Sequence, residues 1–391
     1  MPSRRSAVPP FEVMTVLDQV ATMRAAGRDV ISLCVGEPAG GAPSAVNEAA
    51  AKLHAAGRVF GYTSALGIWP LREALAQHYR RWYGLDVDPS QVAVTTGSSG
   101  GFLLTFLAAF EAGDRVALAR PGYPAYRNIL TSLGCEVVDL QCGPEVRFQP
   151  TVELLAAAHA EHPLKGLILA SPANPTGTMV SRDELAALVK WCDDEGVRLI
   201  SDEIYHGVTY PVGGHRGTSA WELGRESVVV SSFSKYWGMT GWRIGWLLLP
   251  PGLVGAVDAL AGNLALCPPA PAQYAALEAF NDESYAECDA EVAAFAEARE
   301  LLLAAEPRLN WGVSAPADGA FYYYADLGPQ LERWESSGAY AAALLDEAGV
   351  AVTPGRDFDA ALGSRTVRLS FAAGAPAIAE AIERIVAFQN Q

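Results

Sequence analysis

Short β-rich runs alternate with helical stretches through the middle of this chain, and this alternation limits the possible folds more than any other feature. Between residues 90 and 250, runs rich in β-branched and apolar residues predict strands at residues 91–96, 115–119, 136–140, 166–170, 197–201 and 227–231. Between the predicted strands at residues 166–170 and 197–201, Ser181 and Glu184 form a capping box that should begin a helix ending at Gly196. Such alternation favours a mostly parallel sheet with helices on both faces, and a site at the carboxyl ends of its strands.

The pattern changes after residue 275. A long helix is expected over residues 285–305, then short strands at residues 320–325, 351–353 and 366–371, and a last helix with Pro376 in its first turn. A chain of 391 residues also exceeds the usual size of one core. We therefore predict an N-terminal arm with part of a small domain (residues 1–45), a large domain (residues 46–280) and the rest of the small domain (residues 281–391).

Composition argues against several classes of function. The net charge is −16 and no basic run is longer than Arg4-Arg5, so nucleic acid is not an expected partner. No apolar stretch reaches membrane-spanning length, because Pro250 and Pro251 interrupt the best one. The six cysteines include no Cys-x-x-Cys pair, so neither a metal site nor a disulfide scaffold is predicted. Reduced thiols and the lack of a secretory signal favour a cytoplasmic protein.

The segment of residues 231–243 carries the strongest chemical signal. Lys235 follows a predicted strand among hydroxyl side chains, and Arg243 lies eight residues further on. Burial or neighbouring cations lower the pKa of a lysine enough for imine chemistry, and a guanidinium offers a planar fork to a phosphate. A lone lysine at a strand end is more often a surface residue, so the assignment depends on the other motifs.

This segment resembles the cofactor-lysine signature of the class I/II aminotransferases, which are fold-type I enzymes dependent on pyridoxal 5′-phosphate. The similarity runs from about residue 30 to the C-terminus, and it is closest to the subgroup of prokaryotic aspartate and aromatic aminotransferases. It implies an α/β fold-type I structure, with a large cofactor-binding domain built on a mostly parallel sheet flanked by helices, and a smaller α+β domain. It also implies that Lys235 carries the cofactor as a Schiff base.

The resemblance assigns three more residues to the cofactor ring. Asp202, at the end of a predicted strand, would keep the pyridine nitrogen protonated and make the ring an electron sink. Tyr205 and Asn174 would donate hydrogen bonds to the phenolic oxygen of the cofactor. Taken singly, these residues would be read as a helix cap, a core tyrosine and a turn residue. The resemblance also implies a cis peptide bond before Pro175.

A glycine-rich turn and several hydroxyls resemble the family's phosphate cup. Ser98, Ser99 and Gly100 lie where a strand passes into a helix, whose N-terminus favours an anion. Such a turn is weak evidence alone. Together with Ser232, Ser234 and Arg243, it predicts the phosphate contacts. Tyr123 follows the next strand and matches the aromatic residue that stacks on the pyridine ring.

Tyr62 matches the tyrosine that reaches the phosphate of a neighbouring subunit in the family, which predicts a two-fold homodimer with shared active sites. Two matches serve the substrate. Arg368 resembles the arginine that holds the α-carboxylate bidentately, with Arg365 as the alternative assignment, and Gly36 resembles the glycine whose backbone touches the same carboxylate.

One departure bears on substrate choice. Aspartate-specific members of the subgroup carry a basic residue on the helix after the phosphate cup, whereas residues 102–110 here contain no cation. A buried side-chain carboxylate without a partner is costly, so neutral or aromatic amino acids are the expected donors. Tyr62, Trp69 and Trp237 are expected to line an apolar pocket, with residues 13–22 contributing as a loop.

The sequence therefore predicts an aminotransferase that moves an amino group between an L-amino acid and a 2-oxo acid by a ping-pong mechanism, with Lys235 as the general base. The nearest alternative shares the fold: a carbon–sulfur β-lyase, a cyclising lyase or an oxidase using the same cofactor. A cofactor-binding regulator would need a DNA-binding segment before residue 30, and none is apparent there.

Overall fold

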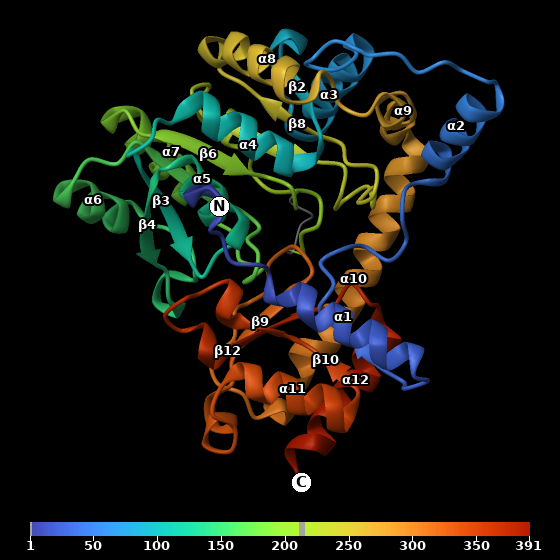
Figure 1. The fold of residues 1–391 in the computed structure, drawn as a ribbon, viewed down its shortest axis with the longest axis vertical. Helices are drawn as coiled ribbons and strands as arrows, with labels where there is room; N and C mark the ends of the chain where they lie inside the picture. The colour runs from blue at the N-terminus through green and yellow to red at the C-terminus, as the bar shows by residue number, and fades with distance from the viewer. Residues whose placement is uncertain (1, 211–215) are drawn as a thin grey trace.

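The computed structural model describes residues 2–210 and 216–391. Its centre is a seven-stranded sheet of order β2-β8-β7-β6-β5-β3-β4, in which β8 is antiparallel to both of its neighbours and the other pairings are parallel (Figure 1). The strands are β2 (Val92–Thr95), β3 (Arg115–Arg120), β4 (Glu136–Gln141), β5 (Gly166–Ala170), β6 (Arg198–Asp202), β7 (Val228–Ser232) and β8 (Gly245–Leu248). The expected α/β fold with a mostly parallel sheet is confirmed.

Both faces of this sheet are covered, because successive side chains of a strand point to opposite faces. Ile168, Ile200 and Val230 belong to one buried cluster, and their neighbours Leu167, Leu199 and Val229 to another. Helices α4 (Gly97–Ala109), α5 (Pro124–Leu133) and α8 (Pro251–Ala265) pack on the first face, and α3 (Trp69–Tyr83), α6 (Val152–Glu161) and α7 (Arg182–Glu195) on the second. Near-continuous apolar strands are what burial on both faces requires.

The C-terminal part forms a second, smaller body. Its antiparallel sheet has the order β11-β12-β9, from β11 (Thr353–Pro354), β12 (Thr366–Ser370) and β9 (Tyr322–Asp326). Helices α11 (Ser337–Ala348) and α12 (Ala375–Gln389) lie beside it, and the long α10 (Asp282–Leu309) runs between the two bodies (Figure 1). The remaining helices are α1 (Glu12–Ala25), α2 (Ser44–Ala55) and α9 (Ala270–Ala275).

The N-terminal segment packs on this smaller body. β1 (Ile31–Ser32) pairs in parallel with β10 (Val350–Ala351), and Val20 of α1 shares a buried cluster with Leu345. This pairing accords with a first segment that contributes to the small domain. The domain boundaries themselves stay a prediction.

Several local expectations can be compared with the structure. The capping box of Ser181 and Glu184 and the helix end at Gly196 are confirmed, as is Pro376 in the first turn of α12. The expectation that residues 13–22 form a loop is wrong, because they lie within α1. Strand β8 was not expected. The predicted strand at 351–353 is two short strands with Val352 between them.

The thiols and the helices bear on two expectations from the composition. All six cysteines are free thiols. Within residues 2–210 and 216–391, no helix combines the length and apolar character needed to cross a bilayer.

Candidate active site

A cavity of about 390 Å³ opens where the carboxyl ends of the parallel strands meet the smaller body. It collects residues from α1, the loop after β1, α4, α5, the strand ends and β12. The predicted site residues on its wall are Gly36, Ser98, Ser99, Tyr123, Asn174, Asp202, Tyr205, Ser234, Lys235, Arg243 and Arg368. Residues separated by more than 300 positions in sequence thus meet at one site.

Three predicted site residues do not line this cavity. The hydroxyl of Ser232 donates to Ser234 Oγ at 2.9 Å and lies behind the wall, so any effect it has on a ligand is indirect. Gly100 lies within the first turn of α4, where its N–H donates to Thr96 O. The side chain of Tyr62 is 83% exposed, away from the cavity of its own chain.

Lys235 lines the cavity and is partly buried. Its Nζ lies 2.6 Å from the carbonyl oxygen of Gly36. Burial, followed by the positive charge of Arg368, lowers the pKa of Lys235 to about 8. A lysine in this state supplies a neutral amine near physiological pH, which a nucleophile or a general base requires.

Asp202 is the last residue of β6 and has two hydrogen-bond donors. Its Oδ2 accepts from the hydroxyl of Tyr126, and its Oδ1 accepts from the N–H of Ile204 at 3.0 Å. Burial raises the pKa of Asp202 to about 6, while these hydrogen bonds and Lys235 act in the opposite direction. The sequence interpretation missed Tyr126. Its position three residues after Tyr123, one turn into α5, could have pointed to it.

The part of the cavity wall formed by Ser98, Ser99 and Arg243 can bind an anion. Ser98 and Ser99 open the 13-residue helix α4, whose free N–H groups face the cavity. Arg243 lies beside them: a Cβ on Gly97 would come within 2.4 Å of its guanidinium Nη2. Gly97 also has φ of +67°, a backbone conformation that favours glycine.

Arg368 forms a second anion-binding group, on β12. Its guanidinium donates to Asn174 Oδ1 at 3.0 Å and to Cys34 O at 2.7 Å. Its Nε is buried and has no hydrogen-bond partner among the described residues, so it is available to a carboxylate. The alternative Arg365 is half exposed and pairs with Asp326, away from the cavity.

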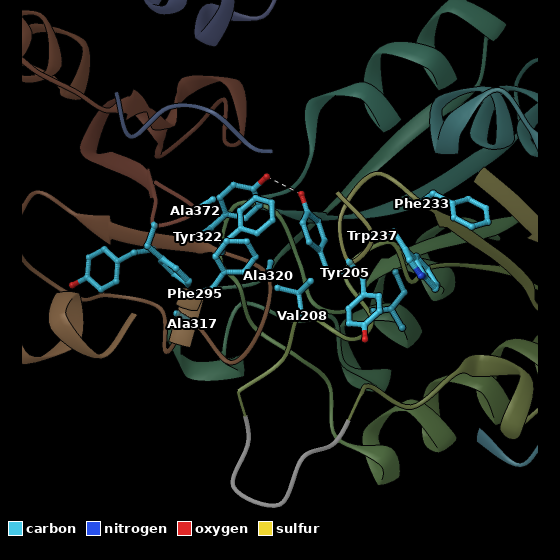
Figure 2. Packing of buried hydrophobic residues seen from close by; sticks show 14 of the residues in the cluster. Tyr205, Val208, Phe233, Trp237, Phe295, Ala317, Ala320, Tyr322 and Ala372 are labelled. Atoms are coloured by element: carbon cyan, nitrogen blue, oxygen red, sulfur yellow. Dashed lines mark hydrogen bonds between the residues drawn. The ribbon is translucent and has the colours of Figure 1, made fainter. Parts of the chain in front are cut away.

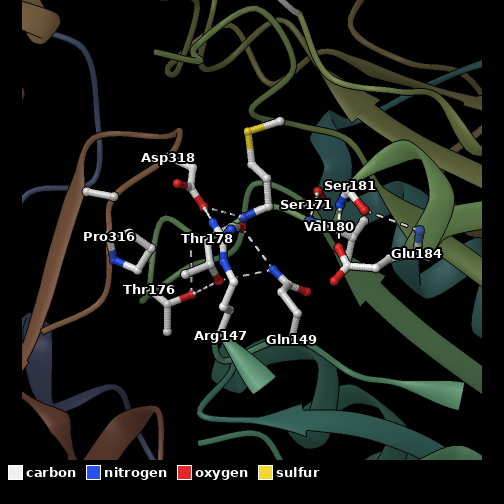
Figure 3. A network of polar contacts seen from close by, with 12 residues as sticks. Arg147, Gln149, Ser171, Thr176, Thr178, Val180, Ser181, Glu184, Pro316 and Asp318 are labelled. Atoms are coloured by element: carbon white, nitrogen blue, oxygen red, sulfur yellow. Dashed lines mark hydrogen bonds and ion pairs between the residues drawn. The ribbon is translucent and has the colours of Figure 1, made fainter. Parts of the chain in front are cut away.

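A polar network holds the loop that carries Asn174. Gln149 Nε2 donates to Thr178 O at 2.8 Å and to Ala170 O at 3.2 Å (Figure 3). Asp318, from the smaller body, accepts from the N–H of Met179 and from Arg147. Because Asn174 Oδ1 already accepts from Arg368, its amide nitrogen is left to donate into the cavity. The peptide bond before Pro175 is cis, as expected.

Tyr205 meets a second tyrosine that the sequence interpretation missed. The hydroxyls of Tyr205 and Tyr322 lie 2.7 Å apart across the boundary between the two bodies (Figure 2). Tyr322 also lies against Gly36, where a Cβ would come within 2.4 Å of its hydroxyl. Tyr322 sits on β9, and its ring centroid lies 4.5 Å from the guanidinium carbon of Arg368, so only the fold brings it to the site.

The apolar wall of the cavity differs from the expected one. Trp237 is buried in the core, with its Nε1 bonded to Ala279 O, and Trp69 lies on the surface next to Glu73. Neither lines the cavity of its own chain. Helix α1 supplies the wall instead, through Val13, Met14 and Leu17, with Phe11 stacked beside Tyr123 at 6.3 Å between ring centroids.

Comparison with known proteins identifies the family. The family described as aminotransferase class I and II matches residues 28–385. The chain belongs to this family. Members of the class I and II aminotransferases use pyridoxal 5′-phosphate, so this chain is a pyridoxal-phosphate-dependent aminotransferase of fold type I.

Related aminotransferases match over nearly the whole chain. A valine–pyruvate aminotransferase from Mycobacterium tuberculosis is 51% identical over 97% of this chain and 96% of its own. An aspartate/prephenate aminotransferase from Thermus thermophilus is 34% identical over 98% and 97%. A crystal structure of an aminotransferase from M. tuberculosis has a TM-score of 0.95 and 50% identity, covering both chains fully.

The residues present fit the family's cofactor. The cavity offers an amine of lowered pKa at Lys235, a carboxylate at Asp202, and an anion site formed by Arg243 with the N-terminus of α4. These match the aldehyde, the pyridine nitrogen and the phosphate of pyridoxal phosphate. Tyr123 lines the same cavity as an aromatic face.

Proposed function

We propose that this aminotransferase transfers the amino group of a neutral L-amino acid to a 2-oxo acid, in two half-reactions that share one site. The observation that carries the proposal is the set of charges on the cavity wall. Its cations are Lys235, Arg243 and Arg368, and each already has a role with the cofactor or the α-carboxylate. Among residues 2–210 and 216–391, no lining cation is left for a second carboxylate of a substrate.

Each polar residue of the cavity has a separate role in the proposed reaction. The bound cofactor supplies an electron sink that stabilises negative charge at the substrate α-carbon. Arg368 would hold the α-carboxylate with Nε and a terminal nitrogen, which fixes the orientation of the substrate. Lys235, once its amine is free, would move the proton from the α-carbon. Asp202 would hold a proton on the pyridine nitrogen, and Asn174 and Tyr205 would donate to the phenolic oxygen.

The apolar wall supports a neutral side chain. Val13, Met14 and Leu17 face the cavity from α1, and Phe358 faces it from the smaller body. The acidic groups Glu37 and Asp357 also line it, and they would repel a second carboxylate. The valine–pyruvate relative agrees with this proposal, whereas the aspartate-named relatives define its main competitor.

We further propose that the working unit is a homodimer with shared sites. Tyr62 is largely exposed beside Val59, and Leu264 and Leu266 are exposed on the neighbouring end of α8. The two segments are in contact, since the N–H of Thr63 lies 3.4 Å from Cys267 Sγ. Exposed apolar side chains on two segments in contact suit an interface. It would let Tyr62 reach the phosphate site of the partner.

The experiment is a donor panel with product analysis. The holoenzyme is given valine, leucine, phenylalanine, alanine or aspartate with a fixed 2-oxo acid, and kcat/KM is measured for each. A neutral donor should exceed aspartate by about tenfold or more, equivalent to about 1.4 kcal/mol. Parallel double-reciprocal plots would support the two half-reactions.

Preference for aspartate would contradict the proposed substrate class. Release of ammonia with no amino transfer, or of hydrogen peroxide, would favour the lyase or oxidase alternative.

A further inference from the structure

A second, small cavity lies beneath the turn that presents Asp202 and Tyr205. Its volume is about 10 Å³, close to the space that a single water occupies. Helix α3 lines one side through His78, Tyr79 and Tyr83, and Glu203 and His206 line the other. All of these side chains except that of Tyr83 are almost fully buried. This polar chamber adjoins the cofactor cavity through Ile204, which lines both, but none of the five side chains named above lines the cofactor cavity.

Glu203 is the central group of the chamber, and its two oxygens differ. Oε1 accepts three hydrogen bonds, from Ala220 N at 2.8 Å, Ser201 Oγ at 3.1 Å and Ser219 Oγ at 3.2 Å. Oε2 is buried and has no hydrogen-bond partner in the described part of the chain. A buried oxygen of this kind needs a hydrogen-bond partner. It can be protonated and donate a hydrogen bond, or it can accept one from a water molecule.

The ring nitrogen Nδ1 of His206 faces Oε2 but does not donate a hydrogen bond to it. His206 Nδ1 lies 3.5 Å from Oε2 and 2.7 Å from the hydroxyl of Tyr83. The His206 ring also forms a hydrogen bond to the backbone of Ser171. With the ring proton on Nε2 for this bond, Nδ1 accepts from the hydroxyl of Tyr83, which keeps its own proton because burial raises the pKa of Tyr83. An ionised Oε2 would then face the lone pair of a nitrogen that is already accepting. The geometry is satisfied if Oε2 carries a proton itself.

The other charged and titratable groups around the chamber do not offset a negative charge there. Burial lowers the pKa of His206 and of His78 to about 3, so both rings are neutral. Tyr79 is a neutral phenol, because burial raises its pKa. Glu222, next to Ala220, adds like charge. Arg216, whose charge acts on His78 and Tyr83, is paired with Asp289. Burial raises the pKa of Glu203 to about 8.

We propose that Glu203 is a neutral carboxylic acid that positions the turn of residues 202–205, and that its Oε2–H donates to one buried water shared with helix α3. The backbone explains the consequence for the site. Glu203 N donates to Val230 O of β7 at 2.9 Å, and Glu203 O accepts from His206 N at 3.0 Å. Its neighbours Asp202 and Tyr205 both line the cofactor cavity. Glu203 thereby acts on the reaction only through them, as a positioning residue.

The direct test is infrared spectroscopy of the holoenzyme at pH 7, with Glu203→Gln as the reference. The wild-type minus variant difference should contain the carbonyl stretch of a protonated carboxylic acid, shifted in D₂O. A high-resolution crystal structure should show one water within hydrogen-bond distance of Oε2. An ionised carboxylate in the difference spectrum, or a dry chamber, would overturn the proposal. Both readouts are independent of turnover.

Kinetics separate positioning from charge. Glu203→Gln keeps a neutral donor and acceptor, so kcat should stay within about threefold of wild type, whereas Glu203→Ala should lower it by about tenfold or more, since small misplacements of catalytic groups are costly. Both variants are first checked for folding by circular dichroism and cofactor content. If Gln is as damaging as Ala in a folded, loaded enzyme, then a charge at residue 203 is required and the proposal is wrong.

Discussion

The hydroxyl of Tyr126 donates a hydrogen bond to Oδ2 of Asp202, and both side chains are buried. Tyr126 comes from α5 and Asp202 from the end of β6, so the bond fixes the carboxylate from a helix on one face of the sheet. It stabilises the ionised form of Asp202 against the effect of burial. In the role proposed for Asp202 with the pyridine nitrogen, its negative charge is therefore maintained by Tyr126, a residue outside the sequence motif.

Replacing Tyr126 with Phe should weaken this arrangement without removing the ring. The pKa of Asp202, about 6 in the native chain, should rise, because a hydrogen bond to its charged form is lost. A hydrogen bond to a charged group contributes about 1.5–3 kcal/mol, so kcat should fall by roughly 10- to 100-fold. The measurement is the pH profile of kcat, whose acidic limb should move to higher pH. An unshifted limb would mean that Tyr126 does not control Asp202.

Replacing Asp202 with Asn tests the charge itself. The shape of the side chain is kept, so the cofactor should still bind, but the proton on the pyridine nitrogen would no longer be held. We expect kcat to fall by about two powers of ten or more, equal to about 3 kcal/mol of transition-state stabilisation. Cofactor content and kcat are measured together. Turnover close to that of the wild type would show that another group protonates the ring.

Sequence alone predicted the part of the site that lies in contiguous motifs. Lys235, Asp202 and Asn174 follow predicted strands, and the ends of parallel strands meet at one edge of a sheet, so their assembly follows from local patterns. Tyr126 and Tyr322 were missed because their roles depend on burial against residues far away in the chain. Trp237 shows the converse error: it lies two residues after Lys235 but points into the core.

Most strands of the large sheet were predicted from the sequence, but one strand and one helix were not. Strands with apolar residues on both faces were recognised, but β8 was not, because its four residues adjoin Pro250 and look like part of a longer apolar run. Helix α1 was taken for a loop because no side chain near its start caps it. Its cap comes from Asp357, which accepts from the N–H groups of Glu12 and Val13 at 3.1 and 3.2 Å. Such a long-range cap leaves no local signal.

This cap gives a prediction about substrate binding. Asp357→Ala should lower the free energy of unfolding by about 1 kcal/mol, the usual cost of losing a cap. Because α1 carries Val13, Met14 and Leu17 into the cavity, KM for a neutral donor should rise more than kcat falls. Asp346→Ala is the matched control, since Asp346 also pairs with the N-terminal segment, at Arg28, but lies outside the cavity. Equal effects of the two variants on KM would contradict the role of the cap.

The proposed dimer can be tested by complementation. Tyr62→Ala should weaken cofactor binding, and Lys235→Ala should abolish transamination. If Tyr62 serves the site of the partner, a mixed dimer of the two variants contains one intact site, formed by Lys235 of one chain and Tyr62 of the other. Mixing after mild dissociation should restore activity toward half of the wild-type level per hybrid dimer. Activity no higher than the sum of the separate variants would show that Tyr62 acts within its own chain or not at all.

Every role proposed for the cavity residues depends on which lysine binds the cofactor. Its place on the cavity wall and its lowered pKa, on which the charges of Arg368 and Asp202 act, single out Lys235. The most direct measurement is borohydride reduction of the holoenzyme, followed by proteolysis and mass spectrometry. We expect the mass of the reduced cofactor on the peptide that contains Lys235, and no such mass on the Lys235→Ala protein. Labelling of Lys52, Lys165 or Lys190 instead, with Lys235 unmodified, would contradict it.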